Sequence, residues 1–160
     1  WPMKRISSAA VPMGAIPGAL PTLIGCAAAQ GAITPLGLTL FAVQFLWQFP
    51  HFWSIGWLGY EDYAKAGYKL LPTRNGQQDP TTGFQSFLYA LLLVPVVILP
   101  WMMGISNVWS AIITVAVSLT YAVFGWNFYQ KMDRKSALQL MFFSFAYIPV
   151  VLATFYLTKL

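Results

Sequence analysis

Long apolar stretches separated by short polar connections make up most of the sequence. Five of these stretches are long enough to cross the hydrocarbon core of a bilayer as a helix, which takes about 20 residues. They cover residues 7–29, 35–58, 84–104, 108–129 and 137–157. A membrane β-barrel would instead alternate apolar and polar residues in segments of about ten, and the sequence lacks this alternation. The pattern therefore predicts an all-α, polytopic transmembrane helical bundle.

Composition narrows the domain organisation. Hydrophobic residues make up 58% of the chain and charged residues 8%, and the mean hydropathy is +0.63. A soluble domain is about one-quarter charged, so this chain has too few polar residues to cover a water-exposed surface. We therefore expect a single membrane domain over residues 1–160, with one long polar connection at residues 59–83.

The basic residues are expected on one side of the membrane. With five spans, the N-terminal segment and the second and fourth connections share one face of the bilayer. These regions hold eight of the nine basic residues: Lys4, Arg5, Lys65, Lys69, Arg74, Lys131, Arg134 and Lys135. The positive-inside rule makes this face cytoplasmic. The net charge of +5 therefore reflects membrane orientation, and we expect no nucleic-acid partner.

A polar stripe runs along the second predicted span. Gln44, Gln48 and His51 stand at i, i+4 and i+7, which places them on one face of a helix. Polar groups that face lipid are costly, so this face should point to the bundle interior or to a wet cavity. Interhelical hydrogen bonding and ligand binding both fit the glutamines. A structural hydrogen bond and a ligand-binding or proton-handling role both fit His51.

Paired carboxylates follow the same span. Glu61 and Asp62 open the run YEDYAKAGYKLLP, and a continued helix would place Asp62 five turns after Gln44. Carboxylates suit a hard cation, and the neighbouring lysines suit phosphate oxygens. Such a rim above an apolar cavity would fit an amphiphile with a diphosphate head and a hydrocarbon tail. An ordinary solvated loop is the alternative.

Two segments resemble a known enzyme family. KRISSAAVPMGAIPGALPTLIG (residues 4–25) and QFLWQFPHFWSIGWLGYEDYAKAGYKLLP (residues 44–72) are similar to the C-terminal half of the protoheme IX farnesyltransferase (haem O synthase) family. This family is a branch of the UbiA-type intramembrane prenyltransferase superfamily. The most specific part is the order of the WQFPHFW run and the DYxxAG loop within residues 47–72.

The resemblance implies a magnesium-dependent prenyl transfer by an enzyme of roughly nine spans, of which about five are present here. Family members join the farnesyl group of farnesyl diphosphate to the 2-vinyl group of haem b and so make haem o for terminal oxidases. The implied partners are these two substrates, the lipid bilayer, and haem A synthase or oxidase-assembly proteins. The implied location is the bacterial inner (cytoplasmic) membrane, with the acidic loop on the cytoplasmic side.

The resemblance also assigns roles to single residues. Asp62, with Glu61, matches the second acidic motif of the superfamily and would bind magnesium. Asp62 and Lys65 would act in catalysis. The implied diphosphate-binding residues are Lys4, Arg5 and Lys65, and we add Lys69 because it is expected on the same face. We further hypothesise that an acceptor cavity for haem is lined by Gln44, Gln48, His51 and Tyr63.

Half of the implied metal site is expected outside this sequence. The first acidic motif, an NxxxD-type sequence between earlier spans, would lie before residue 1, and the chain opens with Trp1 rather than Met. We therefore expect a piece of a longer protein that is inactive alone. Two alternatives stay open: a prenyltransferase for a quinone precursor or another aromatic acceptor, and a non-catalytic haem-handling or transport subunit. An upstream NxxxD motif would distinguish the enzyme from the transporter.

Overall fold

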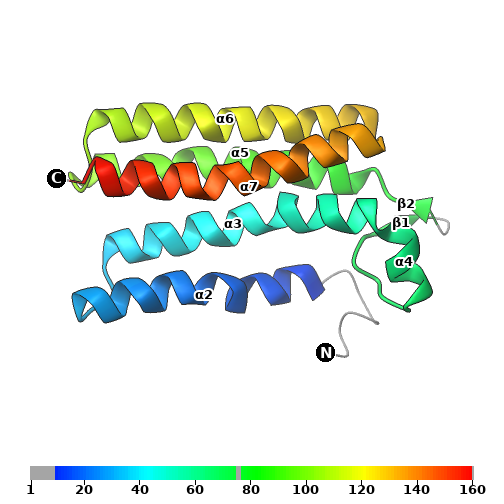
Figure 1. Ribbon diagram of the computed structural model, residues 1–160, viewed down its shortest axis with the longest axis horizontal. Coiled ribbons are helices and arrows are strands. Elements are labelled where there is room, and N and C mark those ends of the chain that lie inside the picture. The colour runs from blue at the N-terminus through cyan, green and yellow to red at the C-terminus, as the bar shows by residue number, and fades with distance from the viewer. Residues whose placement is uncertain (1–9, 75–76, 160) are drawn as a thin grey trace.

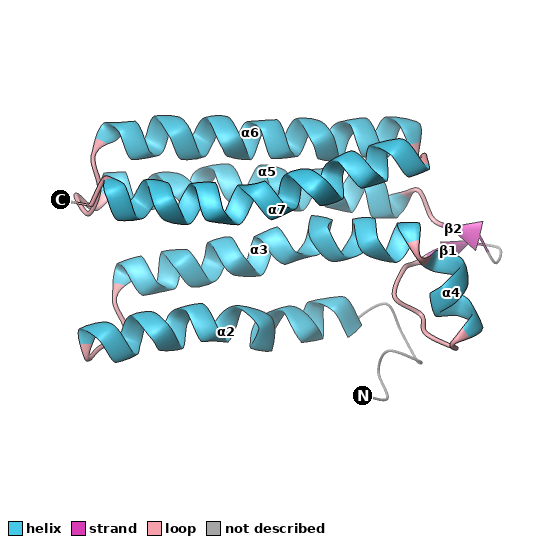
Figure 2. Ribbon diagram, viewed as in Figure 1, coloured by secondary structure: helices cyan, strands magenta, loops and turns pink. Residues whose placement is uncertain are grey.

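The fold is a bundle of long helices lying side by side (Figure 1). A computed structural model describes residues 10–74 and 77–159. Within these residues the long helices are α2 (Ala10–Gln30), α3 (Pro35–Leu58), α5 (Thr81–Met102), α6 (Val108–Lys131) and α7 (Arg134–Leu157). The connection after α3 holds the short helix α4 (Tyr60–Lys65) and the strands β1 (Thr73–Arg74) and β2 (Gln77–Gln78), which pair antiparallel (Figure 2). The predicted all-α bundle is confirmed.

The packing order places α3 in the middle of the bundle. Helix α6 packs against α5 and α7, α3 packs against the same two helices, and α2 packs against α3 at the edge (Figure 1). The main core lies between α3 and the last three helices and includes Leu93, Tyr121, Leu140 and Tyr147, all fully buried. A second, smaller core joins α2, α3 and the following connection.

The helix boundaries lie within three residues of the predicted spans at the described ends. Helices α5 and α7 begin three residues earlier than predicted because their first turns are polar and precede the apolar stretches. Side-chain oxygens of Thr34, Asn107 and Asp133 cap α3, α6 and α7, each accepting from the amide three residues ahead. Such caps satisfy amides that have no partner within the helix.

Four described helices are long and apolar enough to cross a membrane: α2, α5, α6 and α7. Helix α3 has 24 residues but is not among them. Its polar residues Gln44, Gln48 and His51 lower its mean hydropathy. Gln48 and His51 are buried, so α3 directs these groups toward its neighbours rather than toward lipid. All five predicted spans are therefore helices of sufficient length, and four are confirmed by composition.

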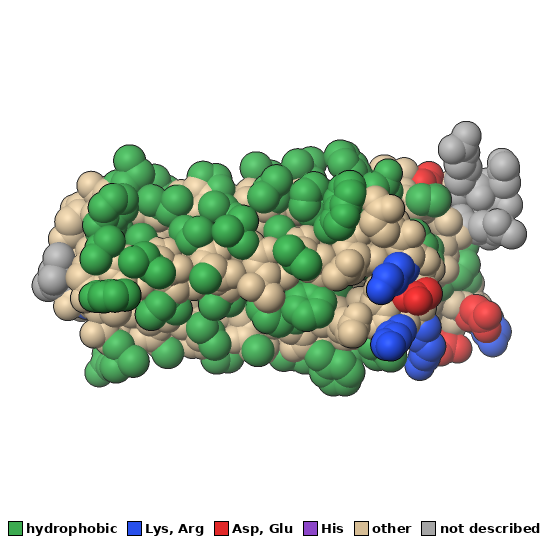
Figure 3. All heavy atoms as spheres, turned by 90° about the horizontal axis from the view of Figure 1, so that it is seen from above, with side chains coloured by type: hydrophobic (Ala, Val, Ile, Leu, Met, Phe, Trp, Pro, Cys, Tyr) green, Lys and Arg blue, Asp and Glu red, His purple; other side chains and the backbone are tan. Residues whose placement is uncertain are grey.

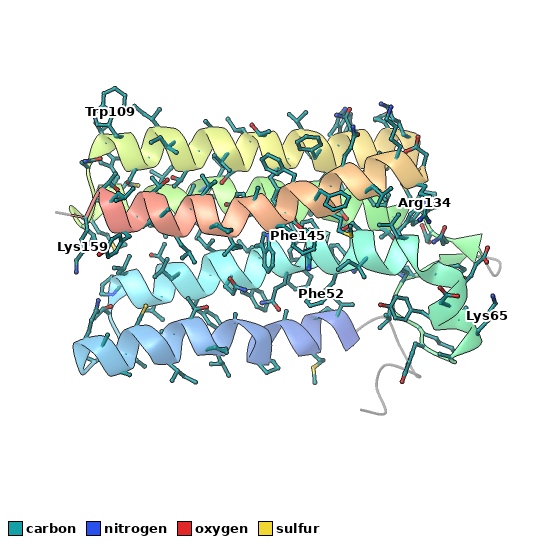
Figure 4. The ribbon with its side chains drawn as sticks, viewed as in Figure 1. Phe52, Lys65, Trp109, Arg134, Phe145 and Lys159 are labelled. Atoms are coloured by element: carbon teal, nitrogen blue, oxygen red, sulfur yellow. The ribbon has the colours of Figure 1, made fainter. Side chains whose placement is uncertain are left out.

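Charge is gathered at one end of the bundle. Figure 3 shows apolar side chains spread over the body of the molecule, while Lys, Arg, Asp and Glu cluster at the end that carries α4. Lys159 lies at the opposite end (Figure 4). The second and fourth connections thus share one end, as the positions of their basic residues predicted. Lys4 and Arg5 lie outside the described residues.

Glycine allows α5 and α6 to approach closely. A Cβ atom added at Gly125 would lie 2.9 Å from the backbone Cα atom of Phe87. Backbone atoms cannot rotate away, so any side chain at this position would push the two helices apart. At Gly25 of α2 an added Cβ would meet nothing within 4 Å.

We expect Gly125→Ala to be less stable than Gly25→Ala by about 1–3 kcal/mol, the usual cost of overpacking. Both substitutions gain helix propensity of up to about 1 kcal/mol, so their difference isolates the packing cost. Thermal unfolding midpoints of the two variants in detergent measure it. Equal midpoints would show that α5 and α6 are not in the contact described here.

Candidate functional site

Gly59 ends α3 and turns the chain into α4. Its amide donates to the carbonyl of Ile55 (3.0 Å), and its own carbonyl accepts from the amide of Tyr63 (3.0 Å). A Cβ atom at Gly59 would lie 3.0 Å from Cε2 of Tyr63, so the absence of a side chain lets this ring fold back. Helix α4 then points away from the axis of α3 (Figure 1). The predicted continuous stripe from Gln44 to Asp62 is therefore wrong.

Glu61 and Asp62 line a polar hollow at the charged end of the bundle. This rim hollow has a volume of about 360 Å³. Its other lining residues come from α3, α4, β2 and α7: Trp57, Leu58, Gly59, Tyr60, Gln78 and Arg134. The side-chain amide of Gln78 donates to the carbonyl of Trp57 (2.8 Å) and so ties the short β-hairpin to the end of α3.

The rim hollow offers two carboxylates to a cation. Among the described residues there is no cluster of three or more His, Cys, Asp or Glu that could hold a metal ion. Mg²⁺ typically takes only one or two protein carboxylates and completes its shell with phosphate oxygens and water. The exposed carboxylates of Glu61 and Asp62 fit that requirement, provided that a ligand supplies further oxygens.

Apolar space lies next to the rim hollow. Asp62 and Tyr63 line a second hollow of about 430 Å³ with Met141 of α7. Tyr63 also lines an apolar hollow of about 300 Å³ between α2 and α3, together with Gly14 and Phe52. Asp62 and Tyr63 therefore join the polar rim to apolar space that reaches toward α2. A molecule with an anionic head and a hydrocarbon tail fits this arrangement.

The basic residues predicted around this site separate in the structure. Lys69 lines a hollow of about 240 Å³ with Tyr63 and Tyr68, adjacent to the rim. Lys65 is exposed and lies on the side of α4 that faces away from the bundle (Figure 4). Arg134 was not predicted as a site residue, yet it lines the rim hollow from α7. Its position depends on the packing of α7 against α3, which no local motif reveals.

Two polar residues of α3 form hydrogen bonds to different helices, Gln48 to α2 and His51 to α7. The side-chain amide of Gln48 donates to the carbonyls of Ala15 in α2 (3.3 Å) and Gln44 (3.0 Å), and Gly18 leaves room for it. Nδ1 of His51 lies 2.7 Å from the hydroxyl oxygen of Ser144 in α7. Gln48 therefore makes the interhelical hydrogen bond that was one of its predicted roles. The predicted common cavity for Gln44, Gln48, His51 and Tyr63 is not among the four hollows described above.

His51 lies between a hydrogen-bonding partner on α7 and several aromatic rings. When the Ser144 hydroxyl donates to the carbonyl of Met141, it accepts from Nδ1–H of His51. Nε2 is then left with its lone pair. The imidazole stacks on Trp47, with ring centroids 4.8 Å apart, and meets the edges of Phe52 (5.3 Å) and Phe145 (5.2 Å). Both phenylalanines are about half exposed (Figure 4), so an aromatic surface opens beside the imidazole.

Comparison with known proteins places the chain among prenyltransferases. It is 43% identical over 159 residues to the protoheme IX farnesyltransferase of Cytophaga hutchinsonii, which covers 99% of this chain and 55% of that protein. The protein of the same name from Flavobacterium psychrophilum is 41% identical over 162 residues, covering 99% and 53%. That from Myxococcus xanthus is 35% identical over 159 residues, again covering 99% and 53%.

The chain therefore spans about half the length of the curated relatives it matches. No solved structure matches it. The model of the UbiA prenyltransferase family matches residues 1–147, which includes every residue of the rim hollow. With its membrane-length helices and its acidic rim, the chain belongs to the UbiA prenyltransferase family.

Proposed function

We propose that the protein containing this chain transfers the farnesyl group of farnesyl diphosphate to the 2-vinyl group of haem b. Diphosphate leaves, water adds to the cation formed on the former vinyl group with loss of a proton, and the product is haem o. The observation that supports this most directly is the position of Asp62, between a polar rim and apolar space. That residue lies in a chain 43% identical to a relative named protoheme IX farnesyltransferase. On this proposal the rim receives the diphosphate head and the apolar hollows receive part of the farnesyl tail.

The chemistry of the rim follows from its charges. Glu61 and Asp62 would hold Mg²⁺, which, when bound, offsets the negative charge that develops on the departing diphosphate. Lys69, beside the rim, can donate hydrogen bonds to phosphate oxygens. The rings of Tyr63 and Phe52, which line the apolar hollow, can stabilise an allylic cation by about 0.5–2 kcal/mol each. The apolar lining also keeps bulk water from capturing that cation early.

The acceptor is proposed to bind beside His51. A porphyrin is a broad, flat, apolar ring, and the exposed faces of Phe52 and Phe145 offer a surface of matching chemistry. Nε2 of His51 would present an acceptor lone pair at this surface. The contact with Ser144 would hold the ring in the tautomer that leaves Nε2 free, which is how proteins commonly prepare an imidazole to contact a metal or a proton donor.

The same proposal gives the protein an orientation and partners. The end that carries α4 would face the cytoplasm of a bacterial inner membrane, because the basic side chains gather there. Haem A synthase or oxidase-assembly proteins would receive the product. Because the relatives are almost twice as long, this chain alone is expected to be inactive.

The first test supplies the full-length protein with haem b, farnesyl diphosphate and Mg²⁺ and measures haem o by mass spectrometry. Asp62→Asn should lower kcat/KM by at least about 100-fold, because the carboxylate charge at the junction of the hollows is lost. Its yield and thermal stability should stay near those of the wild type, since Asp62 is exposed. Glu61→Gln should be milder, because Glu61 lines only the rim hollow among those described.

Absence of haem o with the wild-type protein would refute the proposed function. The same assay can be repeated with a quinone precursor in place of haem b. A farnesylated product from that precursor, without haem o from haem b, would identify the quinone precursor as the acceptor. Full activity of Asp62→Asn would remove Asp62 from the site while leaving the reaction in place.

A second test concerns His51. The side-chain amide of His51→Asn can still donate to Ser144 but provides no counterpart of Nε2. We expect this variant to fold, to bind Mg²⁺ with inorganic pyrophosphate normally, and to form haem o at least about tenfold more slowly. His51→Ala, by contrast, leaves Ser144 without this partner. Its free energy of unfolding should fall by about 1–3 kcal/mol, which a lower unfolding temperature would show. Normal turnover of His51→Asn would leave His51 with a purely structural role.

A further inference from the structure

We propose that Arg134, the first residue of α7, binds a phosphate oxygen of the diphosphate held at the rim hollow. This inference rests on the proposed function and adds to it a residue from the last helix. Arg134 lines the rim hollow together with Glu61 and Asp62, although it lies far from them in the sequence. Figure 4 shows it at the same end of the bundle as α4.

The register between α3 and α7 explains why Arg134 reaches this level. The two helices run antiparallel (Figure 1), and His51 lies against Ser144. A second bond fixes the same level, since Nε1 of Trp47 donates to the carbonyl of Ser144 (2.9 Å). From this contact Asp62 lies 11 residues along its chain and Arg134 lies ten residues back along α7. At about 1.5 Å per helical residue, Arg134 lies about 15 Å from the contact. Leu58, which ends α3 and also lines the rim hollow, lies about 10 Å from the contact toward the same end, and there the chain turns at Gly59 into α4.

Charge complementarity calls for a cation at this place. Two carboxylates with one Mg²⁺ are neutral together, so they leave the negative charge of a diphosphate uncompensated. A guanidinium is planar and can bond two oxygens at once, which suits a phosphate or a phosphate–carboxylate pair. Among the described residues that line the rim hollow, Arg134 is the one with a positive charge.

The acid beside Arg134 in the sequence is already engaged. The carboxylate of Asp133 accepts from the hydroxyl of Ser136 (2.6 Å) and from its amide (2.7 Å). These hydrogen bonds hold the pKa of Asp133 below its ordinary value. Asp133 is thus committed to capping α7, while the guanidinium next to it lines the rim hollow.

Lys135 provides a matched control. Both Arg134 and Lys135 are exposed, and both line an outer groove between α6 and α7 with Phe124 and Phe142. Only Arg134 of the two also lines the rim hollow. A general effect of positive charge at this end of the bundle would affect both positions equally, whereas a specific contact with diphosphate would affect Arg134 alone.

The experiment uses the full-length protein in lipid nanodiscs, as wild type, Arg134→Gln, Arg134→Lys and Lys135→Gln. Calorimetry with inorganic pyrophosphate and Mg²⁺ gives Kd, and the haem o assay gives kcat and KM for farnesyl diphosphate. Arg134→Gln should weaken pyrophosphate binding and raise KM by about tenfold, because a charge-assisted hydrogen bond is lost. Arg134→Lys should weaken binding severalfold, and Lys135→Gln should stay within about twofold of the wild type.

If Arg134→Gln binds pyrophosphate with a Kd within about twofold of the wild-type value, the role of Arg134 is overturned and the proposed function stands. Equal losses in Arg134→Gln and Lys135→Gln would also overturn it, in favour of a general charge effect. If Arg134→Gln does not accumulate, Arg134→Lys decides, and unchanged binding by that variant overturns the role. A wild-type protein that neither binds pyrophosphate nor forms haem o would refute the proposed function, and this inference with it.

Discussion

The need to pair polar groups inside an apolar bundle sets the arrangement of this protein. The hydroxyl of Ser144 in α7 is hydrogen-bonded to Nδ1 of His51, and its carbonyl accepts from Nε1–H of Trp47, so two side chains of α3 meet one residue of α7. Each of these donors, left without a partner, would cost about 1–3 kcal/mol. A slip of α7 along α3 would break both bonds together. The pair therefore holds the two helices in a single register.

That register carries the candidate site. The site is assembled from the break after α3 and from the start of α7, which are far apart in the sequence. Helix α4 has only six residues, and none of them is buried. The buried contact at His51 and Ser144 fixes the level at which the two parts meet. Packing deep in the bundle thus determines which charges face one another at its surface.

Much of the fold follows from the pattern of apolar residues, because each long apolar run needs a helix to satisfy its backbone in a membrane. Three features do not follow from it. The chain turns at Gly59, so Asp62 does not continue the helical face that carries Gln44. The turn is recognised from the ring of Tyr63, which packs against Gly59 in the structure. Gln48 and His51 share a helical face in projection yet bond to helices on different sides. Arg134 reaches the rim through tertiary register, which local sequence does not encode.

The α3–α7 register brings Asp62 and Arg134 to the same hollow. Cysteine cross-linking tests it most directly, in full-length protein in membranes with Cys26→Ser as background. The Asp62→Cys/Arg134→Cys pair should be joined by a short bifunctional thiol reagent. The Asp62→Cys/Leu157→Cys pair should not, because Leu157 ends α7 roughly 35 Å from its start. Cross-linking of the second pair, or none in the first pair when both thiols are reactive, would contradict the account.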